Sequence, residues 1–397
     1  MATFSTRFLG CKVSFADAQA IRERLLSDGH EEVRDGGEIQ VVNTCCVTHE
    51  AVSKSRQAAA RSARSARAVY VTGCASRLEG AFDAVPANVI VAGHTGDEAA
   101  AFVAGDVGAI SCVNAEHRLE RVRAFVKIQD GCSFSCAFCV IPLVRGATRS
   151  RTAGAVLAEI RRRVAQGHRE IVLTGVNLGC FRDREAGYTL ARLVREAGSL
   201  DGVDRLRLSS IEVNHVDDDL ASAIRETASV SPHLHVPLQS GDDEVLRAMG
   251  RRYTVAHLER RLGRLEGIHL TTDVIVGFPT EDEASFERTL RLVERLGMTK
   301  VHVFPYSPRP GTRTAAADTV PAATKRDRSA RLRALSDELC RRRWAGRVGT
   351  LDRVLVDRPG RGYADDYTPW LVEAPVGALV TARAVGVGDE GVLAVAA

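Results

Sequence analysis

Apolar runs alternate with amphipathic stretches through the first hundred residues. Short apolar runs bounded by glycine or polar residues are typical of strands, and apolar residues three or four positions apart are typical of helices. The pattern predicts strands at 6–10, 39–43, 69–73 and 88–92, and helices at 15–28 and 50–67. Such an alternation predicts a parallel sheet with helices on its faces.

The middle of the chain repeats a strand–helix unit more regularly. We expect strands at 122–129, 170–174, 205–209, 233–237, 270–276 and 300–304. Helical patterns lie between them near 151–166, 189–198, 216–229, 242–266 and 282–297. Six such units predict a partial (β/α)6 barrel, two units short of the closed eight-stranded form.

The end of the chain changes character. A basic helix at 322–343 is followed by short β-like runs that Pro and Gly separate, and these runs predict a small all-β barrel. The predicted domains are therefore 1–115, 116–343 and 344–397.

Charge is distributed unevenly over these domains. The 397 residues carry a net charge of +4, but 116–343 alone holds 38 Lys/Arg against 30 Asp/Glu. This excess suits a polyanionic partner such as a nucleic acid, and a solvated basic surface explains it equally well. The chain has no eighteen-residue apolar stretch and no apolar N-terminal run, so we expect no membrane span and a cytoplasmic location.

Ten cysteines in a reducing compartment favour metal or redox chemistry over disulfides. Cys132, Cys136 and Cys139 form a CxxxCxxC run directly after the first strand of the predicted barrel. Three thiolates can bind three irons of a [4Fe–4S] cluster and leave the fourth iron open to chelate S-adenosylmethionine (SAM). An electron from the cluster would then cleave SAM and give a 5′-deoxyadenosyl radical. A zinc site or a set of buried cysteines is the alternative. Zinc knuckles normally occur in pairs or with histidines, and no second knuckle lies nearby.

A second set of cysteines, Cys11, Cys45 and Cys74, stands just past the ends of three predicted strands. Loops at the carboxyl ends of parallel strands meet along one edge of a sheet, so we expect a second cluster there, again with an open iron. Burial of each cysteine as a small apolar side chain is the alternative. Neighbours in extended chain point in opposite directions, so we assign Cys45 rather than Cys46 to the cluster. The remaining cysteines are interpreted as packing residues: Cys112, Cys180 and Cys340. The role of Cys46 is left open, and so is an active-site role for Cys180, which follows a predicted barrel strand.

These motifs resemble those of the radical-SAM tRNA methylthiotransferases, and the resemblance covers nearly the whole chain. The segments that carry it are Leu9-Gly10-Cys11-Lys12-Val13, Val42-Asn43-Thr44-Cys45, Val71-Thr72-Gly73-Cys74, Cys132-Ser133-Phe134-Ser135-Cys136-Ala137-Phe138-Cys139, His235-Val236-Pro237-Leu238-Gln239-Ser240-Gly241, Asp273-Val274-Ile275-Val276-Gly277-Phe278-Pro279 and Phe304-Pro305-Tyr306-Ser307-Pro308-Arg309-Pro310-Gly311-Thr312. The first two segments are most similar to the branch that thiomethylates C2 of N6-threonylcarbamoyladenosine at tRNA position 37. Sister branches act on isopentenyladenosine in tRNA or on an aspartate of a ribosomal protein.

The resemblance implies three domains: a flavodoxin-like domain with the auxiliary cluster, a radical-SAM core with a basic linker helix, and a TRAM-like RNA-binding barrel. It implies two [4Fe–4S] clusters, SAM, tRNA, a reducing electron donor and a sulfur donor, and we expect a monomer. One SAM would donate a methyl group to sulfur at the auxiliary cluster, and a second would yield the radical that abstracts hydrogen from C2. No side-chain acid or base is assigned.

Other positions are candidates for ligand contacts, and each has a loop or solvated-surface explanation as its alternative. For SAM they are Phe138, Asn177, Ser210, Glu212 and Gln239. For RNA they are Lys54, Arg61, Arg64 and Arg67 on the first basic helix, and Arg145, Arg149 and Arg151 after the CxxxCxxC run. The last three could instead meet the carboxylate of SAM.

The chain departs from the family pattern at Ser14, Cys46 and Thr280, and none of these changes removes a predicted ligand. The net charge of −2 over 344–397 weakens the case for that domain as the RNA contact, and the linker helix, with nine Lys/Arg against three Asp/Glu over 325–347, is the alternative grip. A non-catalytic iron–sulfur RNA-binding or electron-transfer protein is the rival of another class. Open iron positions argue against it, because a simple carrier has no use for them.

Overall fold

The computed structural model describes residues 1–93, 95–109 and 122–397. They form two compact units: the first contains the described residues of 1–118 with 130–148 and 307–315, and the second contains the rest. Packing therefore groups the CxxxCxxC segment with the N-terminal sheet. The predicted boundary between 115 and 116 and the cysteine at 112 lie outside the described residues. Within those residues, no helix combines the length and apolar composition that crossing a bilayer requires.

The first unit is built on a five-stranded sheet in which all neighbouring strands are parallel, as predicted. Its strand order, β2-β1-β3-β4-β5, is that of the flavodoxin-like doubly wound fold. The strands are β1 Thr3–Phe8, β2 Glu31–Glu32, β3 Ile39–Thr44, β4 Ala68–Gly73 and β5 Val89–Val91. The helices of this unit are α1 Lys12–Ser27, α2 His49–Ser62, α3 Gly96–Val107 and α4 Ile141–Arg145.

Successive side chains of β3 pack on opposite faces of this sheet, as the two-residue period of a strand requires. Val41 joins a core with α1 and α3, and Val42 joins a core with α2. Helices on both faces explain why these strands are apolar throughout. The predicted helix 50–67 ends at Ser62, so its last turn was wrong.

The second unit contains six parallel strands close to the predicted positions. They are β6 Arg123–Asp130, β8 Glu170–Gly175, β11 Arg205–Leu208, β12 His233–His235, β13 His269–Val276 and β14 Val301–Pro305. The last residue of β6, Asp130, belongs to the first unit. The sheet β11-β8-β6-β7 (β7 Arg149–Ser150) and the sheet β12-β13-β14 are joined by isolated parallel bridges, such as Ser210 to His235. A short hairpin is formed by β9 Arg182–Asp183 and β10 Tyr188–Thr189.

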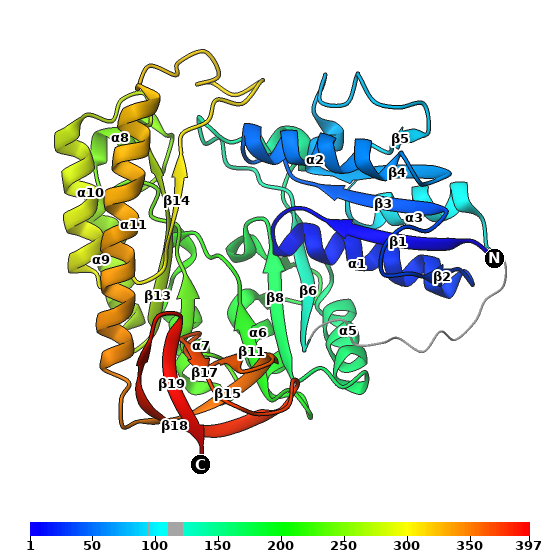
Figure 1. Cartoon of the computed structure of the whole chain (residues 1–397). Helices are drawn as coiled ribbons and strands as arrows, with labels where there is room; N and C mark the ends of the chain where they lie inside the picture. The colour runs from blue at the N-terminus through cyan, green and yellow to red at the C-terminus, as the bar shows by residue number, and fades with distance from the viewer. Residues whose placement is uncertain (94, 110–121) are drawn as a thin grey trace. The chain divides into compact units, whose positions relative to one another are not determined.

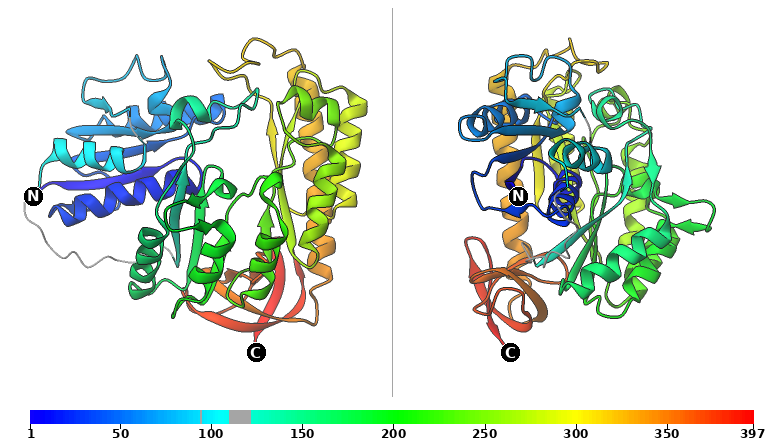
Figure 2. Two further views of the ribbon diagram at one scale, coloured as in Figure 1. Left: turned by 180° about the vertical axis from the view of Figure 1, so that it is seen from behind. Right: turned by 90° about the vertical axis from the view of Figure 1, so that its right-hand side faces the viewer.

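Helices alternate with these strands along the chain. They are α5 Ala153–Ala165, α6 Leu190–Gly198, α7 Asp218–Glu226, α8 Asp243–Ala248, α9 Val255–Leu262, α10 Glu283–Arg295 and α11 Ala322–Ala345. The single helix predicted at 242–266 is two helices, because the chain turns at Gly250, where φ is +74°, and a new helix begins after the Thr254 cap. Figures 1 and 2 show α10 and α11 side by side on the outside of β13 and β14.

The chain ends in a closed five-stranded barrel with Trp370 at its core. Its strands are β15 Leu351–Arg358, β16 Arg361–Tyr363, β17 Pro369–Leu371, β18 Leu379–Gly388 and β19 Gly391–Ala396. The small barrel was predicted, although the strand β16 was not.

A buried carboxylate, Glu170, anchors the end of the parallel strands to this small barrel. Glu170 is fully buried and accepts hydrogen bonds from Arg205 and Arg207, while Arg123 lies 3.1 Å away. Arg205 and Arg207 also donate to carbonyl groups of the small barrel, such as that of Arg353. Burial alone would raise the pKa of Glu170, but the three guanidinium groups outweigh it and lower the pKa to about 2.

We expect Glu170→Gln to lower the free energy of unfolding of the second unit at pH 7 by about 3–5 kcal/mol, because it leaves buried arginines uncompensated. A carboxyl whose pKa falls on folding contributes stability above its unfolded pKa and loses it as the pH falls through the folded value. The difference from wild type should therefore shrink between about pH 5 and pH 2, as measured by denaturant unfolding. The exposed Glu226→Gln is the matched control. A difference that does not change with pH would contradict this role of Glu170.

Candidate functional site

Three cysteines meet at the carboxyl edge of the N-terminal sheet. Cys11 caps α1, Cys45 follows β3 and Cys74 follows β4. A Cβ atom placed on Gly10 would lie 3.5 Å from the Cβ of Cys45, so the Cys11 and Cys45 loops are in contact. Burial, together with smaller effects of the nearby Cys11 and Cys74 thiols, raises the pKa of Cys45 to about 11. The structure thus brings together the three residues that the strand-end argument predicted.

Cys46 is more deeply buried than Cys45, which is partly exposed. Cys46 is fully buried, and the neighbouring Cys74 thiol is the largest cause of the rise in its pKa. It packs in a core with Val140 and Val144, which belong to the segment after the CxxxCxxC run. Cys45 and Cys46 therefore both lie near Cys74, and the assignment of Cys45 as the cluster ligand stays a prediction.

The sulfur of Cys74 receives a hydrogen bond from a buried arginine. Arg145, on α4, donates from Nε to the Cys74 Sγ at 3.0 Å, and its two Nη atoms donate to Asp17 at 2.8 Å and Asp130 at 2.9 Å. The neighbouring Cys46 thiol and the Arg145 guanidinium lower the pKa of Cys74 against the effect of burial. Burial would lower the pKa of Arg145, but Cys74, Asp17 and Asp130 raise it.

Arg145 is 1% exposed. A guanidinium that is buried and bound to two carboxylates is not placed to meet a phosphate, so the predicted RNA contact of Arg145 is wrong. Instead, this side chain connects the segment after the CxxxCxxC run to the other cysteine set, within one compact unit.

The CxxxCxxC loop is held by backbone contacts, and its three thiols remain partly exposed. The Cys132 N–H donates to the carbonyl of Gly146 at 3.0 Å. From the segment 307–315, Arg313 donates to the carbonyl of Ser135 at 2.7 Å and Thr314 to that of Ala137 at 3.1 Å. Each cysteine set offers three thiol donors, which is the chemistry that iron–sulfur clusters require.

Glycine precedes one cysteine of each set where no other residue fits. Gly73 has φ +85°, and a Cβ there would lie 2.7 Å from the carbonyl oxygen of Thr44. Gly131 has φ +69°, and a Cβ there would lie 2.1 Å from the carbonyl oxygen of Ala147. Both positions let the backbone approach its neighbour closely enough to place the following cysteine.

Among the SAM candidates, Gln239 has the strongest structural signal. It has φ +67°, which is strained for a non-glycine residue, and its buried Oε1 accepts no hydrogen bond within the described residues. Glu212 already accepts from Arg251 at 3.3 Å. The N–H of Asn177 donates to Gln129 at 2.8 Å, and Ser210 lies beside His235 in the barrel. Phe138 is partly buried in the cysteine loop.

The remaining RNA candidates are on the surface. Lys54 and Arg61 lie on the exposed face of α2, where Lys54 pairs with Glu50 at 2.7 Å. Arg64 and Arg67 are exposed but follow the end of α2, so they do not continue its helical stripe. Arg149 is exposed, whereas Arg151 bonds Glu159 at 2.5 Å and the carbonyl of Lys127 at 2.9 Å.

Comparison with known proteins gives the family. Residues 126–293 match the Radical SAM superfamily, and residues 3–92 match a family described as Uncharacterized protein family UPF0004. The Bacillus subtilis protein named threonylcarbamoyladenosine tRNA methylthiotransferase MtaB is 34% identical over 368 residues, which cover 86% of this chain and 82% of that protein. The chain belongs to the tRNA methylthiotransferase family. This methylthiotransferase is a radical-SAM enzyme whose cofactors are SAM and two [4Fe–4S] clusters.

Two further matches are a second relative in sequence and a solved structure with a similar fold. A Jannaschia protein named tRNA-2-methylthio-N(6)-dimethylallyladenosine synthase is 33% identical and covers 89% of this chain and 83% of its own length. The radical SAM methyltransferase TsrM from Kitasatospora setae has a TM-score of 0.56 and 15% identity, covering 79% of this chain and 77% of its own. The second match shows a shared fold only.

Sequence analysis missed several residues around the cysteines of this methylthiotransferase. Asp17 and Asp130 bind Arg145, and Arg309, which is 3% exposed, donates to the carbonyl of Cys46 at 3.5 Å. Asp17 lies 128 positions from Arg145 in the sequence, so no local sequence pattern predicts that the two side chains pair. For Arg309 the signal was its place in a family segment.

The two glycines give a prediction that separates the two cysteine sets. We expect Gly73→Ala to lower the iron content from about eight to about four atoms per chain and to retain SAM cleavage, because only the Cys74 loop is displaced. Gly131→Ala should remove the other four irons and abolish SAM cleavage. Iron analysis and a 5′-deoxyadenosine assay measure both effects. Gly36→Ala is the control, because Gly36 has φ +78° but no atom lies within 4 Å of the place that a Cβ would take there. Equal iron loss in all three variants would show that backbone strain alone acts.

Proposed function

We propose that this enzyme adds a methylthio group to C2 of N6-threonylcarbamoyladenosine at tRNA position 37. The observation that carries the proposal is the arrangement of two three-cysteine sets in one compact unit, with Arg145, from the segment after the CxxxCxxC run, bonded to Cys74 of the other set. One cysteine set suits SAM cleavage and the other suits sulfur insertion. The substrate choice is supported by the name of the Bacillus relative and by the Gly-Cys-Lys-Val and Asn-Thr-Cys-x-Val-Thr forms of the first two motifs.

We assign the protein groups as follows. Cys132, Cys136 and Cys139 hold the SAM cluster, and Cys11, Cys45 and Cys74 hold the auxiliary cluster. When bound, these cofactors supply the electron, methyl and radical chemistry of the reaction.

The chain's own groups fix positions. Arg145 neutralises Asp17 and Asp130 and polarises the Cys74 sulfur. The buried Oε1 of Gln239 can accept a hydrogen bond from a hydroxyl or amino group of SAM or of the substrate. Single-stranded RNA recognition requires the target base to leave its stack, so a cavity and not an acid–base pair is the main requirement.

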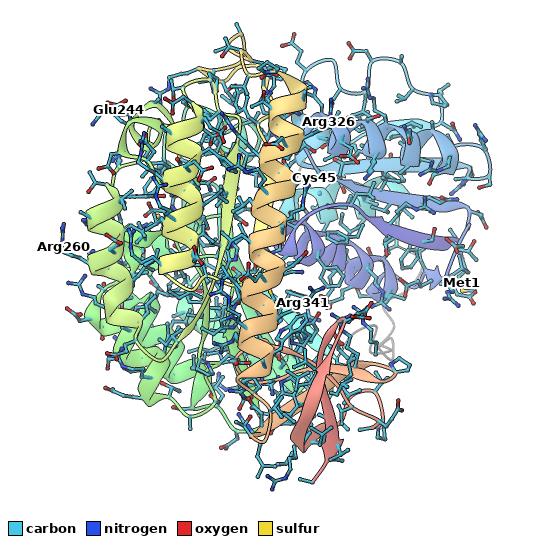
Figure 3. All side chains as sticks on the ribbon, turned by 60° about the vertical axis from the view of Figure 1, so that its left-hand side comes forward. Met1, Cys45, Glu244, Arg260, Arg326 and Arg341 are labelled. Carbon is cyan, nitrogen blue, oxygen red and sulfur yellow. The ribbon has the colours of Figure 1, made fainter. Side chains whose placement is uncertain are left out.

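For RNA binding we assign three arginines of α11. Six of the nine basic residues over 325–347 form ion pairs inside the protein, such as Arg328 with Glu281. Arg326, Arg333 and Arg341 are exposed and have no ion pair within the described residues, and their spacing of seven and eight places them on one side of the helix. Figure 3 labels the first and the last of them near the two ends of α11. We also assign the C-terminal barrel to the TRAM-like class, as a positioning module.

Replacing Arg326, Arg333 and Arg341 with Ala should weaken tRNA binding and reduce the slope of log K against log salt by about 2–3, because each phosphate contact contributes about one unit. Filter binding across a salt series measures the slope. The control removes the same charge from three exposed arginines on α8, α9 and α10: Arg247, Arg260 and Arg291. Similar slopes in the two triple variants would contradict the assignment of α11.

The proposed reaction is tested on tRNA nucleosides from a strain that lacks the gene. Mass spectrometry should find the 2-methylthio derivative of threonylcarbamoyladenosine lost and restored by the cloned gene. An unchanged nucleoside profile would refute the proposal.

Isopentenyladenosine in tRNA is the second candidate substrate, since the Jannaschia relative is 33% identical and carries a name of that branch. In the same experiment, this candidate requires loss of the isopentenyl methylthio nucleoside instead. For either substrate we infer a cytoplasmic monomer that takes electrons from a reducing electron donor and sulfur from a separate sulfur donor.

A further inference from the structure

Three neighbouring strands of the second unit bring two histidines and one carboxylate to one face. Strand β13 lies between β12 and β14, all parallel. Asp273 is directly opposite His302, and His235 is opposite Thr271, two positions before Asp273. Because residues two apart on a strand share a face, His235, Asp273 and His302 lie on the same side of the sheet.

The possible ligand atoms of these three side chains all lie within 4.8 Å of one another. His235 Nε2 is 3.1 Å from the Asp273 Oδ1, and the ring centroids of His235 and His302 are 5.5 Å apart. Ligands bound about 2.0–2.2 Å from a zinc ion are about 3–3.5 Å from one another. His235 and Asp273 already have this separation, and the exposed His302 has a ring nitrogen within 4.8 Å of the ligand atoms of both.

The surroundings of His235 are those of a metal ligand. Its other ring nitrogen, Nδ1, is 2.9 Å from the hydroxyl of Thr271, and this contact aims Nε2 at Asp273. His235 is 8% exposed. Within the described residues, His235 is the only ion-pair partner of the Asp273 carboxylate, so no lysine or arginine neutralises it there. A bound cation would supply that charge.

We propose that His235, Asp273 and His302 bind one divalent transition-metal ion, with Zn²⁺ the best fit. Two imidazoles and one carboxylate are a zinc donor set, and three protein ligands leave a coordination position for water or for an anionic group of a ligand. The site contains no cysteine, and the three strands that supply its residues carry neither cysteine set. It does not depend on which nucleoside the enzyme modifies.

The test uses cluster-loaded enzyme that has been freed of other metals with a chelator and then given Zn²⁺. We expect about one zinc per chain, and a zinc-edge X-ray absorption spectrum with only nitrogen and oxygen ligands at about 2.0–2.2 Å. Zinc captured by the cysteine sets would instead show sulfur at about 2.3 Å. That result, or no bound zinc, would overturn the proposal.

Variants locate the ion. His302→Ala and Asp273→Asn should each raise the Kd for Zn²⁺ at least about tenfold, and Thr271→Val should raise it about 10- to 100-fold by releasing the His235 ring. His257→Ala on α9 is the matched control and should leave the Kd unchanged. Iron content and circular dichroism equal to wild type establish that each variant is folded. His302 is exposed, so its loss should not disturb the core; unchanged zinc affinity in folded His302→Ala would overturn the site.

Discussion

Alanine at Cys136 is expected to abolish both SAM cleavage and methylthiolation, whereas alanine at Cys11 is expected to abolish methylthiolation alone. Each substitution removes one of three thiolates from a cluster, and a cluster held by two thiolates should not survive purification. Iron content should therefore fall from about eight to about four atoms per chain in both variants. Only the Cys11 variant retains the cluster that cleaves SAM. The two assays are 5′-deoxyadenosine formation and methylthio nucleoside formation, each measured anaerobically with a strong reductant.

Both variants have a matched control. Cys11 is exposed, so its replacement leaves the core intact, and Cys340→Ala on α11 removes a half-buried thiol far along the chain from either motif. The Cys340 variant should keep its iron and both activities. If Cys11→Ala kept about eight irons, or lost SAM cleavage together with methylthiolation, the division of labour between the cysteine sets would be wrong.

Arg145→Met is expected to lower both the stability of the first unit and the reduction potential of the auxiliary cluster. The substitution leaves Asp17 and Asp130 buried without their cation, and removing one partner of a buried ion pair costs about 3–5 kcal/mol. A hydrogen bond to a cluster sulfur favours the more negatively charged reduced state, so its loss shifts the potential downward. Denaturant unfolding measures the first effect, and electron paramagnetic resonance at set potentials measures the second.

The second effect separates a tuning role from a purely structural one. Arg22, which is buried, forms an ion pair with the partly buried Glu32 in the same unit, at 2.5 Å. Arg22→Met should therefore lower stability without moving the cluster potential. Arg145→Lys keeps the charge, but its single ammonium nitrogen cannot take the three separate positions from which Nε, Nη1 and Nη2 donate to Cys74, Asp130 and Asp17, so we expect a smaller loss of stability with a shifted potential. An unchanged potential in Arg145→Met would show that Arg145 acts only as a structural cation.

The convergence of Cys11, Cys45 and Cys74 could be predicted because it depends only on strand direction. Once the strands are parallel, residues after their carboxyl ends meet at one edge whatever their distance along the chain. The alternation of apolar runs gives that direction. Strand direction cannot separate Cys45 from Cys46, because it places the whole loop after β3 at the sheet edge and does not say which of two adjacent side chains faces the other cysteines.

Arg145 shows what the sequence could not reveal. An arginine a few residues after a cluster motif has the same local pattern whether it binds RNA or is buried, and only its carboxylate partners decide. Asp17 comes from α1 and Asp130 from the end of β6, so their meeting depends on tertiary packing. The His235, Asp273 and His302 group was hidden for the same reason, since three separate strands contribute one residue each.

The most direct test of the account is the reaction of the reconstituted enzyme with tRNA that carries threonylcarbamoyladenosine at position 37. With SAM, sulfide and a reductant, mass spectrometry should show hydrogen replaced by a methylthio group on that base, with 5′-deoxyadenosine formed in step with the product. Robust SAM cleavage with no change in this tRNA, but with modification of isopentenyladenosine tRNA or of a ribosomal protein, would contradict it.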